Sequence, residues 1–245
     1  MAYTDIDKPS DYFNTVLYTG NNGSNRSITG VGFQPDLVWN KNRSSSANHN
    51  LWNGVTGVTE RLTSSGTQAS EDYSSEFISF DSDGVTITQN AGSLDFNNSS
   101  YNYVNWNWKA GTSFTNDASA TGIGSIDSTG SVNTDAGFSI VSYTGTGSAG
   151  TIKHGLSTAP SMIILKNRSA AEHWMVGTTA LGFTKNLVLS LANAVATDSS
   201  VWNNTAPTSS VFSVGNSGAV NTSSQNYIAY CFAEKQGYSK FGSYT

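Results

Sequence analysis

Charged residues are scarce in this chain: Lys, Arg, Asp and Glu make up 12% of its 245 residues, and the net charge is −5. A nucleic-acid-binding surface needs clustered Lys and Arg, and the sequence contains no basic stripe. No apolar run approaches the roughly 20 residues that a membrane-spanning helix requires. We therefore expect neither a nucleic-acid partner nor membrane insertion.

Cysteine is almost absent, and so is an apolar leader. The single Cys231 cannot form an internal disulfide, and residues 1–9 lack the apolar stretch of a secretion signal. We expect synthesis in a cytosol, even if the protein later works outside a cell. The three histidines, His49, His154 and His173, accompany no Cys or His cluster at metal-ligand spacing. The sequence therefore predicts no metal site and no cofactor.

Small polar residues and aromatic residues take the place of charge. Ser, Thr, Asn and Gly predominate, and the chain has 11 Phe, 11 Tyr and 6 Trp. Ser, Thr and Asn side chains compete for backbone hydrogen bonds and so disfavour helices. The aromatic side chains supply apolar area for a core. This composition predicts an all-β fold.

One stretch of the chain occurs twice. Pro35 and Pro160 correspond at a spacing of 125, and so do the Lys-Asn-Arg-Ser sequences at 41–44 and 166–169. Each copy has a Gly-containing turn and a Pro, then an apolar run rich in β-forming residues, then the Lys-Asn-Arg-Ser turn. The duplication predicts two homologous β-sandwiches in tandem, of jelly-roll or lectin-like type.

The repeat divides the chain into five predicted segments. Residues 1–15 form a polar lead-in, 16–111 the first repeat, 112–136 a Ser/Thr/Gly-rich linker, 137–237 the second repeat, and 238–245 the start of a third repeat or a closing strand. The linker is predicted because its residues are almost all small and polar.

Each repeat is expected to close on a strand of alternating pattern. One face is apolar in both copies and is expected to be core, with Val104, Trp106 and Trp108 in the first and Ile228, Tyr230 and Phe232 in the second. The opposite face carries Asn105 and Asn107 in the first copy but Ala229 and Cys231 in the second. We expect this face to be solvated in the first copy and covered by a neighbouring subunit or the other repeat in the second.

Two short motifs resemble ligand sites but fit turns better. Residues 145–150, Gly-Thr-Gly-Ser-Ala-Gly, match a dinucleotide-binding pattern, but no helix follows that could receive a phosphate, so we expect a hairpin turn. Residues 81–84, Asp-Ser-Asp-Gly, offer oxygens to Ca2+ but lack the other acidic ligands of a calcium loop. Two Asp residues before a Gly are typical of a tight turn.

A glycan-cleaving enzyme would need two carboxylates flanking a sugar cleft. No acidic residue here lies in a repeated or apolar setting that would raise its pKa, and no nucleophile elbow is present. The residues considered for this role are Glu60, Glu71, Asp72, Glu76, Asp81 and Asp83. The sequence therefore favours a non-enzymatic protein over a depolymerase.

Four strings of the sequence lie at residues 29–43, 79–84, 106–111 and 227–234. They resemble a repeat common in structural proteins of marine bacteriophages that infect cyanobacteria and other abundant ocean bacteria. The resemblance implies a virion-surface component of tail-fibre type, often lectin-like, with other virion proteins as partners. It carries no catalytic residues with it.

The turns around the repeated strands combine Trp with polar side chains. A Trp face stacks on sugar C–H groups, while Asn, Arg and His hydrogen-bond to hydroxyls. The candidate ligand-binding residues are Trp39, Asn42, Arg43, His49, Trp52, Lys166, Asn167, Arg168, His173 and Trp174. The alternative is that the Trp residues simply belong to the core.

Three functions follow from these observations. The leading hypothesis is a virion-surface module that contacts a host glycan or receptor through several weak sites, as a homo-oligomer with a trimer favoured. The second is a purely architectural capsid-decoration or fibre-spacer protein. The third, a glycan depolymerase, is the least favoured.

Overall fold

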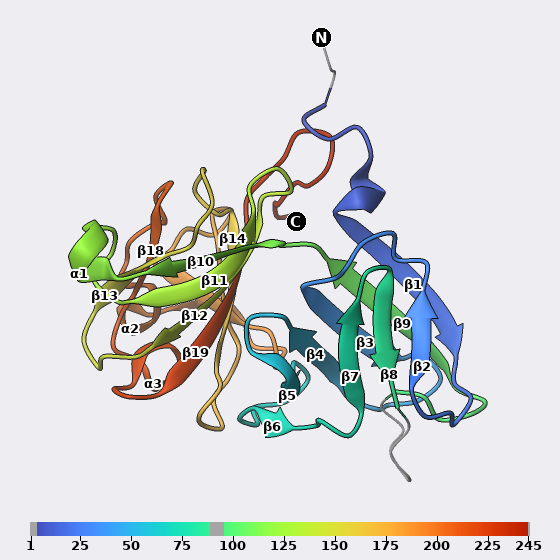
Figure 1. Ribbon diagram of the computed structural model, residues 1–245. Helices are drawn as coiled ribbons and strands as arrows, with labels where there is room; N and C mark the ends of the chain where they lie inside the picture. The colour runs from blue at the N-terminus through green and yellow to red at the C-terminus, as the bar shows by residue number, and fades with distance from the viewer. Residues whose placement is uncertain (1–3, 89–95, 245) are drawn as a thin grey trace. The chain divides into compact units, whose positions relative to one another are not determined.

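The computed structural model describes residues 4–88 and 96–244 (Figure 1). Strands dominate, and each α-helix is a single turn, so the predicted all-β fold is confirmed. The chain forms two compact units: the described parts of Met1–Asp7 and Gly111–Thr245 make unit 1, and those of Lys8–Ala110 make unit 2. No helix in the described part of the chain is long and apolar enough to cross a membrane.

Unit 2 is a sandwich of two antiparallel sheets. The larger has the order β1 (Phe13–Thr19), β9 (Asn102–Trp108), β3 (Leu37–Asn42), β4 (His49–Asn53), β5 (Gly57–Thr63) and β6 (Glu71–Asp72). The smaller has the order β2 (Arg26–Thr29), β8 (Gly84–Ile87) and β7 (Phe77–Asp81), and it lies in front of β1, β9 and β3 in Figure 1. A short 3-10 helix, Pro9–Asp11, precedes β1. The two sheets enclose a core that includes Val38, Trp52 and Phe77.

Unit 1 has the same plan with an addition at one edge. Its larger sheet has the order β10 (Thr112–Asn116), β11 (Ser128–Asn133), β12 (Phe138–Thr144), β19 (Asn226–Phe232), β14 (Met162–Asn167), β15 (Met175–Thr178), β16 (Lys185–Val188) and β17 (Ala196–Thr197). Its smaller sheet pairs β13 (Gly150–Lys153) with β18 (Val211–Val214). The helices are α1 (Ala118–Thr121), α2 (Ser199–Trp202) and α3 (Gly218–Asn221).

The strand order of the two units corresponds. The series β1-β9-β3-β4-β5-β6 of unit 2 has its counterpart in β12-β19-β14-β15-β16-β17 of unit 1. The registers agree as well, because Tyr18 lies opposite Tyr103 in unit 2 as Tyr143 lies opposite Tyr227 in unit 1. The strand that follows the duplicated Pro therefore has the same neighbours in both units, while a common origin of the two stays a prediction.

The prediction that residues 112–136 form a linker is wrong. This segment forms β10, α1 and β11, and the two strands extend the sheet beyond β12. Phe114 lies opposite Gly130, where an added Cβ would come within 2.6 Å of the Phe114 ring. Asp117 caps α1 by accepting a hydrogen bond from the backbone N–H of Ala120. Small polar residues here make room for an aromatic ring and cap a helix, so their composition imitates that of a linker.

Two predicted boundaries also change. β1 begins at Phe13, so the lead-in ends before residue 15. The segment 238–245 was predicted to start a third repeat or close a sheet, but its described residues, 238–244, form no strand beyond an isolated bridge between Ser239 and Lys235. The Phe241 backbone N–H instead donates to the Glu234 carboxylate, and the Phe241 ring lies 6.1 Å from that of Phe232. Thr245 lies outside the described residues.

The predicted core face of β9 is wrong for its two Trp residues, although Val104 on that face is buried as expected. In β9, Asn105 and Asn107 are 2% and 0% exposed and share a face with Val38 of the unit 2 core, whereas Trp106 and Trp108 are partly exposed. The apolar alternation rule fails because Asn105 finds its hydrogen-bonding partner on the neighbouring strand β3.

In β19, the face that carries Ala229 and Cys231 is the inner face of the sandwich. Ala229 and Cys231 belong to the core of unit 1 with Phe212 of the smaller sheet, so a cover from another subunit or the other repeat is not needed there. Ile228 and Tyr230, on the opposite face, are buried too. A strand buried on both faces is apolar on both, which explains the sequence of β19.

The two ambiguous motifs are connections between strands. Residues 81–84 join β7 to β8, and Asp83 accepts hydrogen bonds from the backbone N–H groups of Gly30 and Gly32. Residues 145–150 follow β12 but lead to β13 in the other sheet, so they form a sheet-to-sheet connection and the predicted hairpin is wrong. The side chain of Asn221 holds this connection by accepting from the Thr146 N–H.

Candidate functional site

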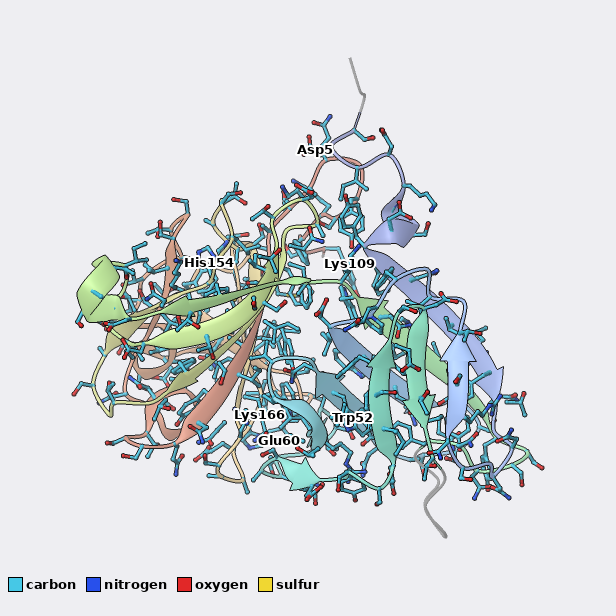
Figure 2. The ribbon with its side chains drawn as sticks, viewed as in Figure 1. Asp5, Trp52, Glu60, Lys109, His154 and Lys166 are labelled. Carbon is cyan, nitrogen blue, oxygen red and sulfur yellow. The ribbon has the colours of Figure 1, made fainter. Side chains whose placement is uncertain are left out.

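The repeated Lys-Asn-Arg-Ser turns are built around a Lys, partly buried as Lys41 and fully buried as Lys166, and a buried Asn. The Lys166 ammonium (Figure 2) donates to the backbone carbonyls of Asn167, over 2.6 Å, and Ala170, over 3.3 Å. Burial lowers the pKa of Lys166 to about 8. In unit 2, Lys41 donates in the same way to the carbonyls of Ser45 and Ala47. The two lysines therefore close their own turns.

The Asn residues that follow these lysines have structural partners as well. Asn42 Oδ1 accepts from the Ser44 N–H over 2.8 Å, and Asn167 Oδ1 accepts from the Ser169 N–H over 2.9 Å. Asn42 and Asn167 are fully buried. A buried amide with its hydrogen bonds satisfied inside the protein does not present them to a ligand. Lys166, Asn42 and Asn167 are therefore corrected from candidate ligand residues to residues of the fold.

The prediction that Trp52 and Trp174 bind a ligand is also wrong, because both side chains are 0% exposed. Trp52 (Figure 2) faces the core of unit 2, where its ring stacks on Phe77 at 5.1 Å. Trp174 stacks on Tyr230 at 6.4 Å. The alternative stated from the sequence, that large aromatic residues are mostly buried, holds for these two.

The remaining candidates on the turns are Arg43 in unit 2 and Arg168 and His173 in unit 1. Arg43 is exposed at the turn after β3. Arg168 is partly buried and donates to Ser142 Oγ over 3.3 Å. His173 Nδ1 lies 3.1 Å from Ser190 Oγ. Within unit 1, Arg168 and His173 therefore contact different partners.

Trp39 and His49, in contrast, meet in a shared site on the outer face of the unit 2 sheet. They lie on the adjacent strands β3 and β4, and two residues of β9, Trp106 and Trp108, complete the lining. We call these four residues the aromatic cradle. They surround a hollow of about 320 Å3, and all four side chains are partly exposed.

The rings of the aromatic cradle stand at steep angles to one another. The Trp39 ring centroid lies 6.4 Å from that of Trp106 with an interplanar angle of 84°, and 6.1 Å from that of His49 with an angle of 80°. Phe13 of β1 packs against Trp108 at 4.8 Å. Edge-to-face packing of this kind fixes the orientation of each ring.

A hydrogen bond fixes the tautomer of His49. The Trp39 indole N–H donates to His49 Nδ1 over 3.1 Å, so Nδ1 is an acceptor and the proton of the neutral ring lies on Nε2. Partial burial, and then the nearby ammonium of Lys41, lower the pKa of His49. The cradle therefore combines three indole rings with one imidazole that is neutral at pH 7.

Trp106 and Trp108 were expected in the core, so sequence reasoning missed their place in this site. Their partner Trp39 lies on another strand, and it comes close to them only through the pairing of β3 with β9. Trp39 and Trp106 lie directly opposite each other in that pair. Residues directly opposite in an antiparallel pair lie on the same face of the sheet.

Residues 8–245 match a protein family described as a domain of unknown function, DUF7483. The chain belongs to the DUF7483 family. No curated protein and no solved structure matches it.

The acidic residues of this DUF7483 chain take part in turns and caps. Hydrogen bonds from backbone or side-chain donors lower the pKa of four carboxyl groups, those of Asp72, Asp83, Asp117 and Glu234. A carboxyl group stabilised in its ionised form is a poor general acid at neutral pH. Within residues 4–88 and 96–244, no three His, Cys, Asp or Glu side chains are placed to hold a metal ion.

Proposed function

We propose that this DUF7483 chain is a non-enzymatic virion-surface protein and that the aromatic cradle contacts a host-surface glycan. The cradle carries the proposal, because its lining consists of three partly exposed Trp residues and one His on a single sheet face. Exposed indole faces suit the apolar C–H face of a pyranose ring, and the surrounding polar groups suit its hydroxyls.

The polar part of the contact comes from the edge of the cradle. Because Trp39 occupies His49 Nδ1, the Nε2–H of His49 is the donor that remains for a sugar hydroxyl. Lys41 lies opposite His49 in the β3–β4 pair. A single cradle of this size offers few hydrogen bonds, so useful affinity requires several copies acting together. We therefore propose a homo-oligomer, with a trimer favoured.

The assignment to a virion rests on the four strings that resemble structural proteins of marine bacteriophages, and it includes other virion proteins as partners. A non-enzymatic role is supported by the lowered pKa values of Asp72, Asp83 and Asp117. A depolymerase would need a carboxyl group with a raised pKa facing a sugar cleft.

The test is binding of the purified full chain to an array of bacterial surface polysaccharides, followed by calorimetry with the strongest glycan. Trp106→Ala should weaken binding about fivefold, because losing one stacked ring costs on the order of 1 kcal/mol. Trp106→Phe should retain most of it. The matched control is Ile78→Ala, which removes a side chain that is 38% exposed on β7 of the other sheet. Equal binding by Trp106→Ala and Ile78→Ala would remove the cradle from the proposal.

A purely architectural role is the second candidate, and the repeated turns favour it. Lys41, Asn42, Lys166 and Asn167 all serve the fold of their own unit. An architectural protein would bind no polysaccharide on the array, and virions carrying Trp106→Ala would adsorb to host cells at the normal rate.

A further inference from the structure

A row of polar side chains crosses the interior of unit 2. Asn105 of β9, Asn40 of β3 and Asn50 of β4 lie directly opposite one another on adjacent strands, and we call them the asparagine row. Thr63 of β5 continues the row beyond Asn50. All are at most 2% exposed, and the row lies on the sheet face that carries Val16 of the adjoining core.

The same row in unit 1 is apolar. Ala229, Leu165 and Met175 occupy the corresponding strands β19, β14 and β15, again directly opposite one another, and Val188 of β16 continues the row. These side chains belong to, or pack against, the core of unit 1. The strand arrangement therefore accepts an apolar row, and the polar one in unit 2 needs a separate explanation.

In the asparagine row, the amide nitrogen of Asn40 has acceptors, but two amide oxygens have no donor in the described part of the chain. Asn40 Nδ2 donates to Asn105 Oδ1 over 2.6 Å and to the Tyr18 hydroxyl over 3.0 Å. Among the described residues, however, Oδ1 of Asn40 and Oδ1 of Asn50 are buried without a hydrogen-bonding partner.

The neighbouring row shows the same deficit. Asn107 lies opposite Val38, and Val38 lies opposite Trp52, so the three share one face. Asn107 Nδ2 donates to the Asn14 and Asn105 carbonyls, but Asn107 Oδ1 and Trp52 Nε1 have no partner in the described part of the chain. Among the described residues of unit 2, one sheet face thus buries three acceptors and one donor without a hydrogen-bonding partner.

We propose that the interior of unit 2 binds ordered water molecules at the asparagine row. Buried polar groups in proteins are almost always satisfied, and internal water commonly does this where several polar groups line an interior. The open groups include three amide oxygens and one indole N–H, so their partner must both donate and accept. A metal cation satisfies only the oxygens, and the row has no carboxylate to balance its charge.

The decisive measurement is a crystal structure of the full chain at about 1.5 Å, where ordered water is visible. The expected result is density within hydrogen-bonding distance of Oδ1 of Asn40, Asn50 and Asn107. Two results would overturn the proposal: a peak with the short, many-oxygen coordination of a cation, or an amide arrangement in which the asparagines satisfy one another without water.

A solution experiment tests the same point independently. Long-lived internal water in the full chain gives a water-deuteron relaxation dispersion. The variant with Asn40→Leu, Asn50→Met and Asn105→Ala copies the unit 1 row and should reduce the dispersion amplitude severalfold. Asn193→Leu, at an exposed loop position, should leave it unchanged. An unchanged amplitude in a folded triple variant contradicts the proposal, and the crystal structure decides the case if that variant does not fold.

Discussion

The side-chain amide of Asn167 donates a hydrogen bond to the hydroxyl of Tyr227 over 3.1 Å, across the pair of strands β14 and β19. The Tyr227 ring in turn stacks on Tyr143 at 5.1 Å. Unit 2 repeats the arrangement, with Tyr18 and Tyr103 also stacked at 5.1 Å. The Asn of each Lys-Asn-Arg-Ser turn therefore ties the end of one strand to the tyrosine pair of its neighbours.

Asn167→Ala should destabilise unit 1 by roughly 3 kcal/mol, because several buried hydrogen bonds are lost at once. Asn167 Nδ2 also donates to the Gly218 carbonyl and the Gln225 amide oxygen. The measurement is urea unfolding of the full chain, with Asn193→Ala in the exposed loop as control. Reduced glycan binding with unchanged stability would instead return Asn167 to the list of ligand residues.

Gly145→Ala should destabilise unit 1 by at least about 2 kcal/mol, because a Cβ at this position would lie 2.2 Å from the Thr222 carbonyl oxygen. The conflict is steric, since the same Cβ would also come within 2.9 Å of the Tyr227 ring. Gly242→Ala is the matched control: nothing lies within 4 Å of its added Cβ, so we expect a change within about 0.5 kcal/mol. Thermal unfolding of the two variants side by side makes the comparison, and equal melting temperatures would show that the β12–β13 connection relaxes freely.

Strands β3 and β14 follow from features that are visible in the sequence. Pro35 and Pro160 stand ahead of two apolar runs, and each run ends at a Lys-Asn-Arg-Ser turn, so strands β3 and β14 and their repetition are readable directly. Local pattern suffices there because the signals lie within one strand and its turns.

The faces of β9 are not readable in this way. Asn105 and Trp106 alternate, and hydrophobicity places the Trp inside, but the partner that makes Asn105 acceptable in the interior is Asn40 on another strand. Burial of a polar side chain depends on such distant partners. Phe114 and Gly130 misled the linker prediction for the same reason, because their contact exists only once β10 pairs with β11.

Stability should fall as the pH is lowered from 7 toward 4, with His154 (Figure 2) contributing about 2 kcal/mol by pH 5. Burial lowers the pKa of His154 to about 4, and the neutral ring is satisfied on both sides. Its Nδ1 accepts from the Leu156 N–H, and its Nε2 lies 3.1 Å from the Thr208 carbonyl oxygen. Between about pH 6.5 and 4 the unfolded chain therefore binds the proton that the folded chain refuses, so acid favours unfolding.

The measurement is the free energy of unfolding in urea at several pH values for the native chain and for His154→Asn. The variant loses some stability at every pH, so the slope against pH is the quantity compared. We expect the native chain to show the steeper loss below about pH 6.5. Parallel slopes would assign the acid sensitivity to other groups.

Protonation of His49 should loosen the aromatic cradle. At neutral pH the Trp39 indole N–H donates to His49 Nδ1, and a proton bound at Nδ1 would set two donors against each other and break that bond. Partial burial and Lys41 lower the pKa of His49, so the bond persists at pH 7 and is lost only below the ordinary histidine range. The indole N–H resonance of Trp39, assigned with Trp39→Phe, should stay constant from about pH 8 to 6.5 and move in more acidic solution.

In His49→Asn this acid transition should disappear, whereas in His173→Asn it should remain. Glycan affinity, if the cradle is the binding site, should fall along the same curve, because the orientation of Trp39 and the Nε2–H donor depend on one imidazole. A Trp39 resonance that titrates identically in His49→Asn would show that protonation of His49 does not cause the change at Trp39.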